Sequence, residues 1–156
     1  AILHDTSVTD LSYRAEALLA AADRAQHLHE VVCPALAAGR HVISDRSVYS
    51  TLAYQGYGRG LAIDEVRRLN DWAVDGLWPE LVVLIDAPAE VLALRMSGRD
   101  LDRFEREDDG FHDRVREGFR AMADAEPERW VVIDGTQSLA VVTTAVRAAV
   151  RERLGI

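Results

Sequence analysis

The sequence predicts an α/β protein in which helices cover both faces of a parallel sheet. Short apolar runs alternate along the chain with longer segments of helical periodicity, and no internal repeat or low-complexity stretch interrupts them. An alternation of strands and helices produces parallel strands joined by right-handed crossovers. The length of 156 residues fits a single domain, 1–156, with enough chain to bury a core.

The composition excludes several functional classes. Hydrophobic residues make up 49% of the chain and charged residues 28%, which is typical of a globular protein. Cys33 is the only cysteine, so we expect neither a disulfide framework nor a cysteine metal cluster. There is no apolar run of membrane-spanning length and no secretory signal, and we expect a cytoplasmic protein. The net charge of −8 argues against general nucleic-acid binding, but it leaves room for a small anion held by local arginines.

The first predicted element is a long helix over 11–38, where apolar side chains keep helical spacing. Pro34 lies inside this pattern, so we expect a kink or a break near residues 31–33. Arg24 and Gln26 lie on this helix and can reach a ligand. The pattern alone, however, favours ordinary solvated helix residues.

Two charged residues follow the next predicted element, a short β-branched strand over 41–44. They are Asp45 and Arg46. In open α/β sheets, ligands bind just beyond the carboxyl ends of the strands. A carboxylate there can hold a metal or accept a proton, and a guanidinium can grip a phosphate. An isolated Asp-Arg pair is more often a simple ion pair, so the residues that follow decide between the two interpretations.

A helix-compatible segment, 48–55, comes next. Gly56, Gly58 and Gly60 then predict a loop that holds Arg59. Glycines at this spacing are a weak signal for a phosphate-binding loop, because they are as often simple turn residues.

The rest of the chain continues the alternation of helices and strands. A continuous apolar run at 81–85, ended by Asp86, is typical of a strand covered on both faces. A loop over 134–137 follows the last strand. In order, we expect a helix over 64–73, a strand over 81–86, helices over 88–96 and 111–123, a strand over 130–133 and a helix over 140–154.

The segment 97–110 breaks the periodicity, because it is highly charged and contains two glycines. Arg95, Arg99 and Arg103 recur every four residues around it and would share one face of a helix. Two interpretations stay open: a salt-bridged solvent face, and an arginine-bearing lid that closes on a polyphosphate.

Six segments, in this order and at this spacing, resemble the thymidylate kinase family. The most specific is the Asp-Arg pair with AYQGYGRG over 45–60, followed by LDRFE at 101–105. The resemblance runs from about Leu18 to the C-terminus. The other segments are AADRAQH at 21–27, PALAAGR at 34–40, LVVLIDAPAEV at 81–91 and VVIDGTQS at 131–138.

This resemblance implies a fold and an activity. The fold is of the P-loop kinase type, a five-stranded parallel sheet with helices on both faces, of which the first two strands are missing from this chain. The activity is phosphoryl transfer from ATP, with Mg²⁺, to thymidine 5′-monophosphate, which gives the diphosphate for dTTP synthesis. The implied partners are thymidylate, ATP and a second copy of the chain packed through 11–38, with no nucleic acid polymer and no membrane. The segment 95–109 would be the lid.

The resemblance also assigns roles to individual residues. Asp45 would lie near Mg²⁺, through water, and near the transferring phosphoryl group. Arg46 would clamp the acceptor phosphate, and Arg24 would contact the thymine. The other implied residues are the catalytic lid arginines Arg95, Arg99 and Arg103, the sugar and base contacts Ser50, Thr51, Tyr54 and Gln55, and the adenine-flanking loop of Gly135, Thr136 and Gln137.

Three departures from the family pattern leave alternatives open. All 18 basic residues are arginine, whereas a P-loop needs a lysine on the β- and γ-phosphates. We therefore expect an N-terminally truncated chain that is inactive by itself. Ala20 replaces a phenylalanine that stacks on thymine, and Ser47 replaces an aromatic residue or histidine. The alternatives are a kinase for another deoxynucleoside or deoxynucleotide, and a non-catalytic nucleotide-binding or dimerisation module.

A missing central strand would leave a gap in the sheet. We expect the strands at 81–86 and 130–133 to be parallel neighbours at about 4.8 Å. The strand at 41–44 would stand off from 81–86 by two strand spacings, roughly 10 Å.

Overall fold

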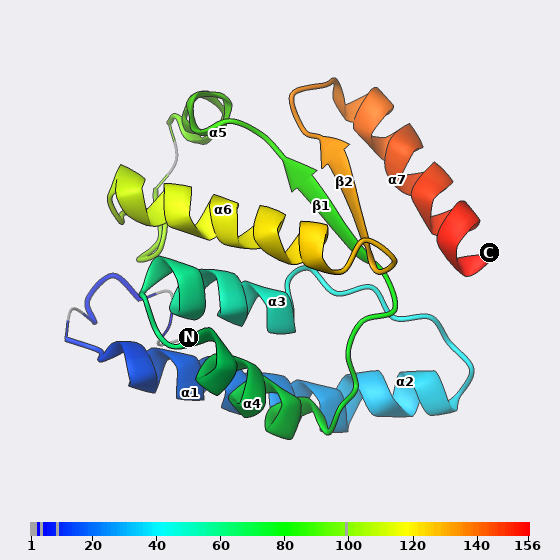
Figure 1. Cartoon of the computed structure of the whole chain (residues 1–156), viewed down its shortest axis with the longest axis horizontal. Coiled ribbons are helices and arrows are strands. Elements are labelled where there is room, and N and C mark those ends of the chain that lie inside the picture. Colours follow the sequence, from blue (N-terminus) through cyan, green and yellow to red (C-terminus); the bar gives the residue numbers. More distant parts are fainter. Residues whose placement is uncertain (1–2, 4, 9, 99) are drawn as a thin grey trace. The chain divides into compact units, whose positions relative to one another are not determined.

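The computed structural model describes residues 3, 5–8, 10–98 and 100–156, and Figure 1 shows the course of the chain. The chain divides into two compact units. Unit 1 consists of Ala1–Trp78 and Asp102–Val115, and unit 2 of Pro79–Leu101 and Arg116–Ile156. The assignment of 1–156 to one domain therefore stays a prediction, and each unit is described by itself.

Unit 1 is helical and begins with the predicted long helix. The helix α1 (Tyr13–His27) starts at Ser12, whose hydroxyl oxygen accepts a backbone N–H of the first turn. It continues through a π-helical turn, η2 (Leu28–Val32), into α2 (Cys33–Ala37). The irregularity predicted ahead of Pro34 is thus a π-helical turn inside one continuous helix, because proline offers no N–H to the regular hydrogen-bond ladder.

The second helical segment includes the helix predicted over 48–55 and extends to Gly58. The helix α3 (Val48–Thr51) continues directly into a π-helix, η3 (Leu52–Gly58). The prediction of a glycine loop is therefore wrong for Gly56 and Gly58. A Cβ atom on Gly58 would lie 2.6 Å from the Phe111 ring. This glycine permits close packing of a ring against the helix and does not form a phosphate-binding loop.

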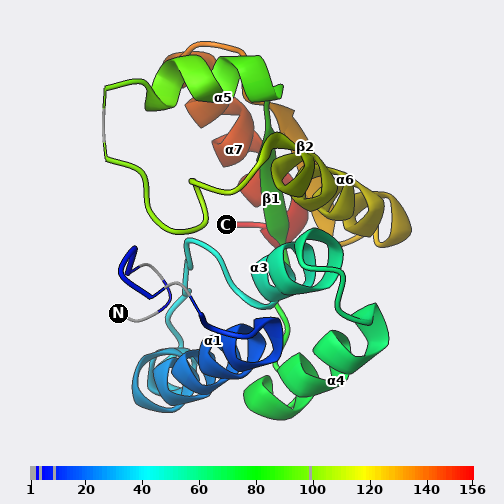
Figure 2. The ribbon, with the colours of Figure 1, turned by 90° about the vertical axis from the view of Figure 1, so that its left-hand side faces the viewer.

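The helix α4 (Ile63–Val74) confirms the predicted helix over 64–73. Contacts join α1, α3 and α4, which lie side by side in Figure 2. Their buried apolar side chains provide much of the core of unit 1, and these include Ala17, Ala21, Val48, Leu52, Ala53, Val66 and Val74.

Unit 2 contains a parallel sheet of two strands, β1 (Val82–Asp86) and β2 (Trp130–Asp134), as predicted. The register places Val82 opposite Trp130 and Asp86 opposite Asp134, so both strands end in a carboxylate at the same edge. The helix α7 (Leu139–Leu154) lies along β2 (Figure 1), and α5 (Ala89–Met96) follows β1.

The remaining helix, α6 (Asp109–Ala125), contributes residues as far as Val115 to unit 1 and the rest to unit 2. It confirms the helix predicted over 111–123. No helix among the described residues is long and apolar enough to cross a bilayer.

Two predictions about strands are wrong, one for residues 41–44 and one for the burial of β1. Residues 41–44 form neither helix nor strand, and Ile43 is 98% exposed. The strand β1 is not covered on both faces, since Ile85 is 52% exposed. A β-branched run becomes a strand only where a neighbouring strand shares its backbone hydrogen bonds, and the described sheet consists of β1 and β2 alone. The five-stranded sheet and the spacing of 41–44 from β1 stay predictions.

Candidate nucleotide site

Arg24 lies at the centre of a polar cluster in unit 1. Its Nη1 donates to Asn70 Oδ1 at 2.6 Å, and its Nη2 donates to Thr51 Oγ1 at 2.9 Å and to the Ser47 carbonyl at 3.1 Å. The Asn70 side chain is fully buried, and its Nδ2 donates to the Val66 carbonyl at 2.7 Å. That bond turns the Asn70 carbonyl oxygen toward Arg24 and fixes the guanidinium between α1, α3 and α4.

Arg24 is a largely buried cation that no carboxylate hydrogen-bonds among the described residues. Burial lowers the pKa of Arg24 to about 10, against the opposing effect of the Asp23 charge. The guanidinium therefore stays charged at neutral pH, although its three hydrogen-bond acceptors in the described part of the chain are neutral. A desolvated cation of this kind favours a ligand that brings acceptor atoms.

Two turns earlier on α1, Glu16 forms a second buried cluster. Its carboxylate has no exposed surface and accepts hydrogen bonds from Arg59 at 3.3 Å, from Gln55 Nε2 at 2.7 Å and from Arg103. Arg59 also pairs with Glu107 at 2.7 Å. Two carboxylates thus balance two guanidiniums in the interior of unit 1.

The environment of Arg59 differs from that of Arg24. Burial by itself would lower the pKa of Arg59, but hydrogen bonds to Glu107 and Glu16 raise it above the ordinary value. The ring centres of Tyr13 and Phe111 lie 4.8 Å and 4.6 Å from the Arg59 guanidinium carbon. Arg59 is therefore paired and enclosed by rings, which is typical of a residue that stabilises the fold.

The two clusters share one face of α1. Glu16, Ala20 and Arg24 are spaced four apart and lie on the same side of that helix. The facing segment is α3 with η3: Arg24 donates a hydrogen bond to Thr51 on α3, and Glu16 accepts one from Gln55 on η3. The two helical segments therefore run antiparallel at this contact, and Ala20 lies between the two clusters.

The implied phosphate and metal ligands, Asp45 and Arg46, are both exposed. Arg46 adopts a left-handed backbone conformation with φ of 67°, which is rare for a residue with a side chain. The Ser44 hydroxyl donates to its carbonyl at 2.7 Å. The Arg46 guanidinium carbon lies 4.9 Å from the centre of the Tyr54 ring. The two charged side chains are thus open to a ligand from solvent.

The fit of Mg²⁺ to this site rests on Asp45. Among the described residues there is no group of three histidine, cysteine or carboxylate side chains that could hold a metal by themselves. Mg²⁺ commonly takes only one or two carboxylates and completes its shell with substrate phosphates and waters. A single exposed carboxylate beside an exposed arginine fits that mode.

The implied base and sugar residues lie on α3 and η3. Thr51 and Gln55 are buried and turned toward α1, where Arg24 and Glu16 hold them. Ser50 and Tyr54 are partly exposed. Sequence reasoning thus predicted these residues, but it did not predict the buried partners that orient them.

Two of the implied lid arginines, Arg95 and Arg103, do not lie on one helix. Arg95 lies in unit 2 and donates to the Gly135 carbonyl at 2.7 Å, whereas Arg103 lies in unit 1 on Glu16. Arg99 lies outside the described residues. The helix α5 ends at Met96, so no helix continues from Arg95 to Arg103. The solvent-face interpretation is also wrong for Arg103, whose side chain is largely buried.

In unit 2, the implied adenine loop follows β2. Gly135 leaves no room for a side chain, since a Cβ atom there would lie 2.9 Å from the Asp86 carbonyl. Thr136 and Gln137 both donate to the Asp134 carboxylate, which lowers the pKa of Asp134. Gln137 also lines a pocket of about 490 Å³ between β2 and α7.

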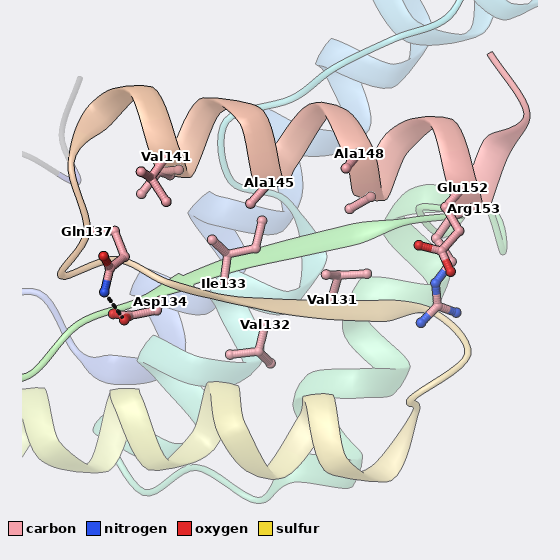
Figure 3. A pocket seen from close by; sticks show the side chains of 12 residues that line it. Val131, Val132, Ile133, Asp134, Gln137, Val141, Ala145, Ala148, Glu152 and Arg153 are labelled. Atoms are coloured by element: carbon pink, nitrogen blue, oxygen red, sulfur yellow. Dashed lines mark hydrogen bonds between the residues drawn. The ribbon is translucent and has the colours of Figure 1, made fainter.

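Figure 3 shows this pocket from close by. Ile133 points from β2 toward α7, and Val132 points to the opposite side of the strand. The lining is mostly apolar, with Asp134 and Gln137 at one end and Glu152 and Arg153 at the other. Gly135 and Thr136 lie outside it.

Sequence reasoning missed Glu16 and Asn70 in unit 1 and the Asp86 cluster in unit 2. Arg116 grips the Asp86 carboxylate with two hydrogen bonds, at 2.7 and 3.0 Å, and Arg120 adds an ion pair at 3.6 Å. Glu16 could have been predicted, because it lies about two helical turns before Arg24 on the same face of the predicted helix. No sequence signal links Asn70 to Arg24, because 46 residues separate them.

Comparisons with known proteins identify the family of this chain. The family model for thymidylate kinase matches residues 2–146. The thymidylate kinase of Geotalea uraniireducens is 46% identical over 161 residues, which cover 99% of this chain and 76% of the relative. That of Desulfovibrio desulfuricans is 44% identical over 162 residues, covering 99% and 75%. That of a Synechococcus species is 50% identical over 140 residues, covering 90% and 67%. The chain belongs to the thymidylate kinase family.

Proposed function

We propose that this protein transfers a phosphoryl group from ATP to thymidine 5′-monophosphate. Family membership supports this activity. The observation in the structure that carries it is the guanidinium of Arg24 on α1, a desolvated cation held by three neutral acceptors, which are Asn70 on α4, Thr51 on α3 and the carbonyl of Ser47, the residue before α3. A base with carbonyl oxygens supplies the further acceptor atoms that such a cation lacks.

The acceptor phosphate binds Arg46, which is exposed and carries a planar fork of donors suited to a phosphate. Asp45, beside it, holds Mg²⁺ through water. When bound, Mg²⁺ neutralises charge that develops on the transferring group. The contribution of this chain is positioning: Arg24 for the base, Arg46 for the phosphate, and Ser50 and Tyr54 for the sugar.

The remaining roles concern the phosphoryl donor and the assembly. Arg95, Arg99 and Arg103 neutralise the phosphates when the segment 95–109 closes. Gly135, Thr136 and Gln137 flank the adenine of ATP, and the apolar pocket beside Gln137 supports this placement. The enzyme acts as a homodimer in the cytoplasm.

A second candidate is a kinase for another deoxynucleotide. Ala20 favours it, because a methyl group stands between Glu16 and Arg24 where the family resemblance implies a stacking ring. A missing stacking surface weakens the preference for one base by about 1 kcal/mol.

The test is a phosphoryl-transfer assay. A P-loop needs a lysine on the β- and γ-phosphates, and these 156 residues include none. The chain is therefore assayed alone and also joined behind a P-loop segment from an active thymidylate kinase. We expect the joined protein to form thymidine diphosphate and to prefer thymidylate over deoxyguanylate and deoxycytidylate. Arg46→Lys should reduce kcat/KM at least a hundredfold with an unchanged melting temperature. A preference for another nucleotide, or full activity of Arg46→Lys, would contradict the proposal.

A further inference from the structure

Glu16 determines which way the amide of Gln55 faces. An ionised carboxylate can only accept hydrogen bonds, and Glu16 already accepts them from Arg59 and Arg103. The group that Gln55 turns toward Glu16, at 2.7 Å, must therefore be its NH₂. The carbonyl oxygen of Gln55 is then at the opposite end of the amide. In the described part of the chain this oxygen has no hydrogen-bond partner, and it is not sealed from solvent.

Asn70 fixes Arg24 in a complementary way. The Asn70 NH₂ is committed to the Val66 carbonyl, so its oxygen faces Arg24 and accepts at 2.6 Å. Arg24 can only donate. Asn70 thus holds Arg24 as a hydrogen-bond donor, and Glu16 orients the Gln55 oxygen as an acceptor.

The donor and the acceptor lie on the same side of the α3–η3 segment. Arg24 bonds Thr51, and Gln55 follows Thr51 by four residues, which places both on one face about one helical turn apart. Across from them, Ala20 lies between Glu16 and Arg24 on α1. Its side chain is a single methyl group, so Ala20 itself places no large group between donor and acceptor.

The edges of the pyrimidine bases present opposite patterns. Thymine and uracil carry a carbonyl oxygen, O4, beside a ring N–H, whereas cytosine carries an amino donor beside a ring nitrogen that accepts. A donor from Arg24 beside an acceptor from Gln55 matches the first pattern and opposes the second.

We propose that Glu16 is a positioning residue for base selection: by fixing the Gln55 amide, it makes the site read the O4 and N3–H edge of thymine or uracil and reject cytosine. This inference rests on the proposed function, since it takes the nucleotide base to lie between Arg24 and Gln55.

The test compares two ligands that differ only at this edge, deoxyuridine and deoxycytidine 5′-monophosphate. Dissociation constants are measured by NMR titration of the 156-residue chain, with thymidylate as the reference ligand. We expect the chain to favour deoxyuridylate by at least about tenfold, since one good pair of base contacts discriminates by that much or more. In Glu16→Gln, whose amide can donate to Gln55, the ratio should fall below about threefold.

Two further variants make the result decisive. Glu107→Gln removes the other carboxylate from Arg59 but leaves Gln55 on Glu16, so its ratio should match that of the unaltered chain. Gln55→Met removes the acceptor and keeps the ionic cluster, so it should lose the discrimination even if Glu16→Gln does not fold. In the unaltered chain, the Gln55 side-chain amide protons should exchange slowly with solvent.

An unchanged ratio in Gln55→Met, or in folded Glu16→Gln, would overturn the inference while thymidylate binding keeps the proposed function intact. Failure of the unaltered chain to bind thymidylate would overturn both.

Discussion

Each unit contains one carboxylate that pairs with two guanidiniums, but the two clusters differ in their exposure to water. Glu16 in unit 1 is fully buried, and its partners Arg59 and Arg103 are nearly so. In unit 2, Asp86 is 12% exposed, and its partners Arg116 and Arg120 are 35% and 56% exposed. Both clusters join a carboxylate to two guanidiniums, so comparing them shows the effect of desolvation, although Arg59 also pairs with Glu107.

Desolvation decides how strongly each cluster depends on its members. A buried carboxylate cannot be replaced by water, and its removal leaves guanidiniums without a counter-charge in a low-dielectric interior. Water replaces a partner at the surface at little cost. The cluster around Glu16 should therefore be indispensable to unit 1, whereas unit 2 should tolerate the loss of its ion pairs.

The largest expected effect comes from removing Glu16. Glu16→Ala removes the carboxylate from Arg103 and leaves Arg59 with Glu107 alone, and it should lower the free energy of unfolding of unit 1 by about 3–5 kcal/mol. Hydrogen exchange, followed residue by residue, measures this loss. Amides of α1 and η3 should lose protection, whereas those of β1 and β2 should keep theirs.

Asp86→Asn is the matched control for that experiment. It removes the corresponding carboxylate from unit 2, and we expect a loss below about 1 kcal/mol, because Arg116 and Arg120 can turn to solvent. Equal losses for the two variants would refute the distinction between the units.

A smaller effect should appear on acidification. The hydrogen bonds from Arg116 outweigh the opposing effect of burial and hold the pKa of Asp86 below its usual 3.8. Its contribution to stability is therefore present above pH 3.8, and it is lost as the pH falls through the lowered pKa of the folded state. Comparing urea midpoints of the unaltered chain and Arg116→Gln between pH 5 and pH 2 tests this. The difference should shrink on acidification, and a constant difference would count against the role of the pair.

The sequence predicted local structure well where the chemistry is local. The helices over 11–38, 64–73 and 111–123 and the strands at 81–86 and 130–133 follow from periodicity and apolar runs, and the structure confirms them. The prediction of a strand at 41–44 was wrong, because a strand needs a neighbouring strand and hydrophobic periodicity does not show whether one is present. Gly58 was assigned to a loop because its contact with Phe111 joins residues 53 positions apart.

The candidate site shows the same limit. Arg24, Thr51 and Gln55 were assigned to the site from motifs in their own segments, and these roles stay predictions. Glu16 and Asn70, which orient Gln55 and Arg24, were not found, because their polar contacts span 39 and 46 positions. Asn70 also resembles an ordinary helix residue until the fold places it beside Arg24.

The most direct test of the account is to map where thymidylate binds on the 156-residue chain. In an NMR titration, amide shifts caused by thymidylate should gather in unit 1, around residues 20–24 and 45–55, while α7 and β2 stay unchanged. Arg24→Lys keeps the charge and loses the planar fork, so it should weaken binding at least about tenfold. Shifts centred on the pocket between β2 and α7, or unaltered binding by Arg24→Lys, would contradict a thymidylate site on the face of α1.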